Sequence, residues 1–94
     1  PFNCYIVSIN PKSNKDLTIK VDKIYSKLIK CGIEVFLDDR DLNPGIKFRD
    51  ANLMGVPFQL VISDKINNDS VELINTKNQK KEILKIDQII DRIK

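Results

Sequence analysis

The stretch that decides the fold is GIEVFLDDRDLNPGIKFRDANLMGVPFQLVIS, residues 32–63. It contains two runs rich in β-branched and aromatic residues, IEVFL (33–37) and FQLVIS (58–63), which predict buried strands. Between them, Asn43 followed by Pro44 is typical of a helix N-cap and first helical position. Gly55 ends that helix near residue 54, because glycine adopts the left-handed conformation that closes helices. The stretch therefore predicts a strand, a helix and a second strand.

The same pattern extends outward in both directions. Residues 3–9 predict a strand, and residues 15–30 predict a helix with apolar residues at three- and four-residue spacing. Two further strands, 71–75 and 82–84, are joined by the turn TKNQK, and Ile86, Ile89, Ile90 and Ile93 form the apolar stripe of a last helix. Strands that alternate with helices pair in parallel, and the hairpin adds antiparallel pairing. We expect one α/β domain over residues 1–94, a three-layer α/β/α fold with three helices on a mixed sheet of about five strands.

Composition narrows the classes of function. The chain has 94 residues and a formal net charge of +3, a mild bias that is compatible with a nucleic-acid partner or with an A/T-rich genome. Two cysteines and no histidine argue against zinc, which needs about four Cys or His ligands. Two free thiols, no signal peptide and no apolar run of about 18 residues predict a cytoplasmic protein without a membrane span. Because residue 1 is proline, we expect a fragment of a longer protein.

The acidic run Asp38-Asp39-Arg40-Asp41 has three interpretations. A metal or acid–base site needs carboxylates whose pKa values are pushed apart, whereas Arg40 would keep its neighbours ionised. A contact from Arg40 to nucleic acid is the second interpretation. The favoured one is structural: the aspartates end a strand and pair with Arg40 or Lys47. Ligands of open α/β sheets usually bind beyond the carboxyl ends of the strands, which places residues 38–40 and 64–65 on the expected functional edge.

Several other polar residues are candidates for nucleic-acid contact. Gln59 and Lys65 have side chains that can bond base edges, as in single-stranded RNA loops. Lys47 and Arg49 are expected as solvated charges of the second helix, with phosphate binding as the alternative. The lysines of the first helix, at 20, 23, 27 and 30, are expected to form a solvated face. Without histidine, and with no activated serine, the sequence indicates no catalytic centre.

Residues 32–63 also resemble the sequence pattern of a known protein family. Gly32–Val35, Leu37–Arg40, Pro44-Gly45 with Lys47-Phe48, Ala51, Leu53 and Gly55–Pro57 follow one family pattern, and the opening PFNCYIVSIN is similar to that family's entry strand. Together they resemble the C-terminal anticodon-binding domain of class II aminoacyl-tRNA synthetases, most closely the bacterial-type prolyl-tRNA synthetases. The resemblance covers essentially the whole chain and is weakest after Asp64.

The resemblance implies a function for the domain within a longer enzyme. The parent would be a proline–tRNA ligase, a homodimer through its catalytic domain, and that domain would use ATP and Mg²⁺. The domain itself would hold no cofactor or metal and would bind the anticodon loop of tRNA(Pro), reading the two guanines that proline anticodons share. The matching contact positions are Asn52, Gln59 and Lys65, with Arg40 and Lys47 as secondary contacts. A family glutamate commonly stands at position 52, and some members have arginine at position 59.

Two alternatives stay open at this point. The fold can serve as an interaction or dimerisation module that has lost RNA reading, which the unusual residues at positions 52 and 59 suggest. The domain can also belong to a threonyl- or histidyl-type relative, although the stretch LDDRDLNPGIKF (37–48) fits the prolyl pattern better.

Overall fold

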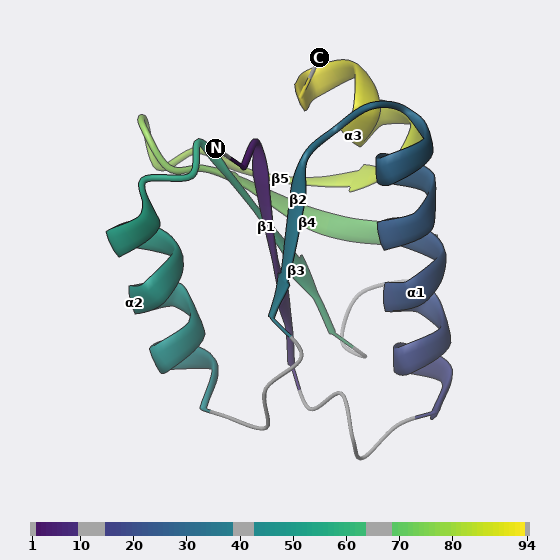
Figure 1. The fold of residues 1–94 in the computed structure, drawn as a ribbon, viewed down its shortest axis with the longest axis horizontal. Helices are drawn as coiled ribbons and strands as arrows, with labels where there is room; N and C mark the ends of the chain where they lie inside the picture. Colours follow the sequence, from purple (N-terminus) through teal and green to yellow (C-terminus); the bar gives the residue numbers. More distant parts are fainter. Residues whose placement is uncertain (1, 10–14, 39–42, 64–68, 94) are drawn as a thin grey trace.

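A computed structural model describes residues 2–9, 15–38, 43–63 and 69–93 of the chain. The chain folds into five strands and three helices within these ranges (Figure 1). In chain order they are β1 (Cys4–Ser8), α1 (Lys15–Lys30), β2 (Val35–Asp38), α2 (Pro44–Met54), β3 (Phe58–Ile62), β4 (Ser70–Asn75), β5 (Lys81–Lys85) and α3 (Ile86–Ile93). The predicted order of strands and helices is confirmed.

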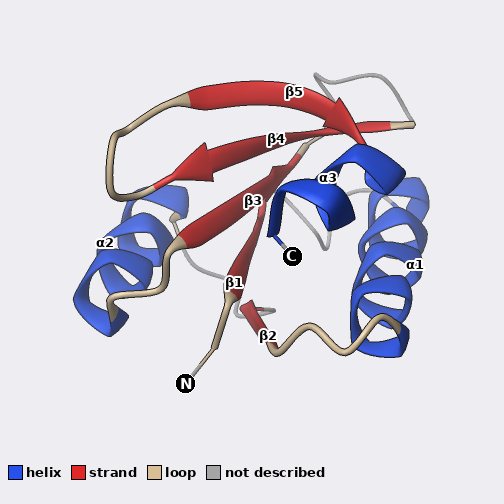
Figure 2. Ribbon diagram, turned by 90° about the horizontal axis from the view of Figure 1, so that it is seen from above, coloured by secondary structure: helices blue, strands red, loops and turns tan. Residues whose placement is uncertain are grey.

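The five strands form one mixed sheet in the order β2-β1-β3-β4-β5. Strand β1 pairs in parallel with both β2 and β3, whereas β4 is antiparallel to β3 and β5 is antiparallel to β4. Figure 2 shows the resulting twist, with β5 at one edge of the sheet and β2 at the other. The parallel half comes from the two crossover helices and the antiparallel half from the hairpin, as the sequence predicts.

Helices cover the two faces of the sheet unequally. Helices α1 and α3 pack on one face, and α2 lies on the other (Figure 1). Alternation along β1 serves both layers: Cys4 and Ile6 belong to the core under α1, while Tyr5 and Val7 belong to the core under α2. The result is the expected three-layer arrangement, with the larger core beneath α1 and α3.

The boundary between α1 and β2 differs from the prediction. Gly32 has a φ of 81° and follows the end of α1. The backbone N–H of Gly32 donates to Ile29 and that of Ile33 to Leu28, at 3.0 and 3.1 Å, which is the Schellman pattern of a helix C-terminus. Because this cap uses the N–H of Ile33, β2 begins at Val35 rather than at residue 33. At its other end β2 includes Asp38, which lies opposite Val7 of β1.

Helix α2 is bounded as the sequence predicts. The side chain of Asn43 accepts a hydrogen bond from the backbone N–H of Gly45 at 2.8 Å, and Pro44 takes the first helical position. Gly55 closes the helix with a φ of 71°. The two caps fix both ends of α2, and so fix which of its residues face the sheet.

Lys47 is fully buried, which contradicts the expectation of a solvated surface charge. Its ammonium group donates to the carbonyl oxygens of Ser8 and Asp38, both at 3.1 Å. These are the last residues of the neighbouring parallel strands β1 and β2. The buried Asp38 carboxylate accepts a hydrogen bond from the Tyr5 hydroxyl. The acidic end of β2 is therefore a structural feature at Asp38, and Lys47 holds two strand ends together rather than reaching solvent.

Replacing Lys47 is expected to destabilise the domain strongly. Lys47→Ala leaves two buried carbonyl oxygens without their donor and removes a packed side chain, at a cost of about 2–5 kcal/mol in the free energy of unfolding. Urea denaturation followed by circular dichroism measures this change. Arg49→Ala is the matched control, because Arg49 is two-thirds exposed and, among the described residues, pairs with the adjacent Asp50 alone; it should change stability by less than about 0.5 kcal/mol. Equal midpoints for the two variants would contradict the structural role of Lys47.

The two free cysteines should differ in reactivity. Burial raises the pKa of the Cys4 thiol from 9.0 to about 12, whereas Cys31 is only partly buried. Because the thiolate is the reactive form, a thiol reagent at pH 8 should modify Cys31 in the folded domain and Cys4 only after unfolding. Mass spectrometry after labelling, with and without urea, tests this expectation. The variant Cys31→Ser should then stay unlabelled while folded, and rapid modification of that variant would contradict the burial of Cys4.

The raised pKa of Cys4 also gives a pH dependence of stability. Above pH 9 the unfolded chain releases the Cys4 proton while the folded domain retains it, so the free energy of unfolding should fall as the pH rises from 9 toward 12. Cys4→Ala should show a shallower decline over this range when unfolding is measured in urea at each pH. Identical slopes in the two proteins would show that other groups set the alkaline limit.

Candidate nucleic-acid interface

Two of the residues singled out in the sequence, Asn52 and Gln59, meet in the structure. Gln59 near the start of β3 is buried, and its Nε2 donates to Oδ1 of the exposed Asn52 near the end of α2 at 2.9 Å. Lys47, five residues before Asn52, lies inside the domain on the ends of β1 and β2, where a phosphate cannot reach it. Arg40 and Lys65 lie outside the described residues.

The Asn52–Gln59 pair lies at the opposite end of the sheet from the expected functional edge. Helix α2 runs back antiparallel to β1, so its C-terminal end meets the amino ends of the parallel strands (Figure 1). Gln59 lies beside Tyr5 of β1 and Ile74 of β4. The expectation of a site beyond the carboxyl ends of the strands concerns residues 38–40 and 64–65, so Asn52 and Gln59 form a separate candidate region. Asn52 and Gln59 lie at the C-terminal end of α2 and the amino end of β3, away from the carboxyl ends of the strands.

A cavity of about 220 Å³ opens beside this amide pair. It lies between α2 and the face of β3, β4 and β5 that α2 leaves open. Its walls are Phe48, Asn52, Gln59, Glu72, Ile74, Thr76, Gln79 and Lys81. Pockets for drug-sized ligands measure roughly 300–1,000 Å³, so this volume suits a single ring system. Phe48 and Asn52 are one helical turn apart, which puts a ring and an amide on the same face of α2.

Internal hydrogen bonds occupy part of the polar wall of this cavity. Thr76 donates through Oγ1 to the carbonyl oxygen of Val56 at 2.8 Å, and Gln79 donates through Nε2 to that of Thr76, also at 2.8 Å. In contrast, no described residue forms a hydrogen bond or ion pair with the carboxylate of Glu72. Glu72 is partly buried in the middle of β4, opposite Val61 of β3 and Ile83 of β5.

Glu72 was not singled out from the sequence. The alternation of the predicted strand 71–75 already puts Glu72 on the face opposite Val71 and Leu73. The sequence does not show that this face adjoins the end of α2, because that contact depends on the antiparallel pairing of β4 with β3. Phe48 packs in part against the core under α2 and also lines the cavity.

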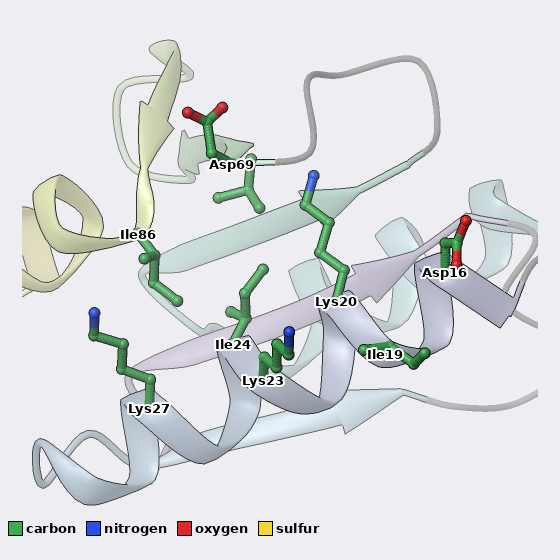
Figure 3. A pocket seen from close by; sticks show the side chains of 9 residues that line it. Asp16, Ile19, Lys20, Lys23, Ile24, Lys27, Asp69 and Ile86 are labelled. Carbon is green, nitrogen blue, oxygen red and sulfur yellow. The ribbon is translucent and has the colours of Figure 1, made fainter.

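A second hollow of about 420 Å³ lies on the other face of the domain, along α1 (Figure 3). Three lysines of α1 line it, at positions 20, 23 and 27, and Asp69 faces them from the other side. Lys20 donates through Nζ to the carbonyl oxygen of Ser70 at 2.6 Å, and Lys27 pairs with Asp87 at 2.6 Å. Burial lowers the pKa of Lys20, with the Asp69 carboxylate acting in the opposite direction. Two of the three cations therefore have partners within the chain, which makes this hollow a weak anion site.

The described residues contain neither a cluster of metal-ligating side chains nor a helix that could span a membrane. Within residues 2–9, 15–38, 43–63 and 69–93, no three side chains of His, Cys, Asp or Glu gather in the way that a metal site requires. Of the helices in these same ranges, none has both the length and the apolar character needed to cross a bilayer.

Comparison with known proteins places the chain in a family. A family model described as an anticodon binding domain matches residues 3–94. The proline–tRNA ligase of Persephonella marina is 42% identical over 96 residues, covering 99% of this chain and 17% of that protein. The proline–tRNA ligase of Thermoanaerobacter sp. (strain X514) is 37% identical over 94 residues, covering 100% and 16%. The chain thus spans less than a fifth of the length of these curated relatives.

The fold agrees with this family. The crystal structure of prolyl-tRNA synthetase from Cryptosporidium parvum, with L-proline and AMP, matches with a TM-score of 0.85. The match covers 99% of this chain and 22% of that chain at 21% identity, so it bears on the fold alone. The match of the family model to residues 3–94 makes the chain a member of the anticodon binding domain family.

Proposed function

We propose that the chain is the anticodon-binding domain of a prolyl-tRNA synthetase and that it binds the anticodon loop of tRNA(Pro). The rest of such an enzyme, beyond these 94 residues, would carry the catalytic domain that attaches proline to tRNA with ATP and Mg²⁺ and would form the homodimer. We expect the protein to act in the cytoplasm. We assign no catalytic group or metal to this domain itself.

The observation that carries the proposal is the identity with named proline–tRNA ligases along almost the whole chain. The relatives from Persephonella marina and Thermoanaerobacter are 42% and 37% identical and cover 99% and 100% of the 94 residues. The cavity beside Asn52 and Gln59 supports the same function. It joins an aromatic ring, an amide pair and the charged side chains of Glu72 and Lys81, the kind of surface on which unstacked RNA bases are bound.

Each part of this surface has a role in the proposal. Phe48 offers apolar contact to a base, and Asn52 offers an amide to a base edge. Gln59 acts through Asn52, because it is buried and bonded to it. Lys65 and Arg40 lie outside the described residues, and the resemblance alone supports their proposed role of supplying charges toward phosphate or base oxygen atoms. Lys47 is left out of the RNA-contacting set because it is buried beneath the ends of β1 and β2.

The 94-residue chain should prefer an RNA stem-loop with a proline anticodon over loops in which either shared guanine is replaced by adenine. Each lost base-edge interaction should raise the Kd by about tenfold or more, since good base contacts discriminate by about 1–3 kcal/mol. Fluorescence anisotropy at one fixed salt concentration measures the Kd values, and light scattering on the same samples reports the oligomeric state. Equal affinity for all loops would refute the proposed reading of the anticodon. A dimer without RNA affinity would favour an interaction module instead.

Lys65→Ala should weaken binding to the proline stem-loop by about tenfold, because hydrogen bonds to charged groups contribute about 1.5–3 kcal/mol. Lys23→Ala is the matched control: it removes the same charge from α1, on the face of the sheet opposite the cavity beside Asn52 and Gln59, and no described residue bonds to Lys23. The control should change the Kd by less than about twofold, as expected for the loss of one distant charge in moderate salt. Equal effects of the two variants would remove Lys65 from the site.

A further inference from the structure

The carboxylate of Glu72 has an unusual environment for a charged group. It is partly buried on β4, and its neighbours across the sheet, Val61 and Ile83, are both apolar. The cavity holds one cation, Lys81, on the adjacent strand, yet no ion pair joins the two side chains among the described residues. Because no described residue donates to this partly buried carboxylate, both of its oxygens are available to accept hydrogen bonds from a ligand.

The hydrogen bond between Asn52 and Gln59 determines which polar group of Asn52 is available to a ligand. Because Oδ1 of Asn52 accepts from Gln59, the amino group of Asn52 remains to donate. Asn52 therefore offers a donor and Glu72 offers two acceptor oxygens along the same cavity. A matching ligand carries one acceptor and two neighbouring donors on a ring small enough for about 220 Å³.

Guanine is the RNA base with that pattern. Its Watson–Crick edge places the O6 acceptor beside two donors, N1–H and N2–H₂, whereas the corresponding edges of adenine, cytosine and uracil lack two adjacent donors. A carboxylate can accept both guanine donors at once, and such charge-assisted paired bonds are the strong and directional ones. Phe48 lines the cavity and supplies apolar contact to the ring.

We propose that Glu72 determines specificity for one guanine of the anticodon loop, with its carboxylate accepting from N1–H and N2–H₂ while Asn52 donates to O6. This assignment rests on the proposed function of the domain and names the group that reads the base. It places the acidic reader on strand β4 instead of at the end of α2. Gln59 is then a positioning residue, because its bond to Asn52 keeps the Asn52 amino group directed outward.

The test combines one variant with one modified base. Inosine keeps O6 and N1–H but lacks the amino group at position 2, so replacing the contacted guanine by inosine removes one of the two donors. The unchanged domain should bind that loop about tenfold more weakly, as expected for one bond to a charged acceptor. Each of the two shared guanines is replaced in turn, and anisotropy titrations at fixed salt give the Kd values.

Glu72→Gln should weaken binding to the guanine loop by about tenfold or more and should reduce the difference between guanine and inosine to less than about twofold. Removing a negative charge generally strengthens binding to RNA, so a loss of affinity runs against the electrostatic trend. Glu82→Gln is the matched control, since it removes the same charge from the adjacent strand on the opposite face of the sheet, where Glu82 pairs with Arg92 at 3.1 Å.

The outcomes separate this assignment from the proposed function. A guanine preference that survives unchanged in Glu72→Gln overturns the role of Glu72 and leaves anticodon binding in place. Equal binding of all loops by the unchanged domain overturns the proposed function, and this assignment with it. Urea denaturation of both variants checks that each remains folded, and Gln59→Leu gives a second measurement. It should weaken discrimination against adenine at the same guanine position while keeping the carboxylate of Glu72.

Discussion

The change from parallel to antiparallel pairing at β3 determines how the two faces of this domain are used. On one side of β3 the strands β1 and β2 are parallel, and the helices that connect parallel strands must cross over the sheet. On the other side the chain continues as the hairpin of β4 and β5, which needs only a short turn. Helix α2 therefore covers β1, while Ile83 on the same face of the hairpin remains exposed. The candidate interface lies at this boundary.

In the parallel half of the sheet, Lys47 provides hydrogen-bond donors for the buried ends of two strands. Neighbouring parallel strands end side by side, and here the last carbonyl groups of β1 and β2 lie beneath α2, away from water. A buried carbonyl group without a donor is costly, and the ammonium of Lys47 donates to both of them. Burying a cation is itself unfavourable, and the hydrogen bonds of Lys47 compensate for the water that its ammonium group loses. The same residue therefore fixes α2 against the sheet, and with it the position of Asn52 at the end of α2.

Local signals in the sequence were sufficient for most of the fold. Caps at Asn43 and Gly55 gave the limits of α2, and the isoleucine stripe gave α3. The sequence predicts β2 to start at Ile33, two residues too early. An apolar residue at this position fits both a strand and the cap of α1, and only the hydrogen bond from the N–H of Ile33 to Leu28 distinguishes them. Lys47 was misjudged because lysine is usually exposed. Its spacing of four residues from the buried Ala51 put it on the inner face of α2, and this signal was available.

The candidate site was less accessible to sequence reasoning because it is assembled from distant segments. Asn52 and Gln59 were named separately from the resemblance, and the hydrogen bond between them appears only in the folded chain. Glu72 depends on the register between β3 and β4, which places it across from Val61 and on the face shared with Gln59. A strand pattern gives the alternation of faces but not which helix borders a face.

The modest charge of the domain is consistent with a surface that selects bases more than it attracts phosphates. A net charge of +3 supplies few counterion-releasing contacts, so nonspecific affinity for RNA should be small. A carboxylate in the cavity lowers that affinity further, because it repels the phosphate backbone. The carboxylate favours binding only of a base that donates to both of its oxygens, since a wrong base would leave those oxygens without donors. An uncharged amide pair, with one acidic and one basic side chain that leave the cavity without net charge, therefore favours discrimination over tight binding. Attraction to the rest of the tRNA would then fall to the larger enzyme of which we propose this domain to be a part.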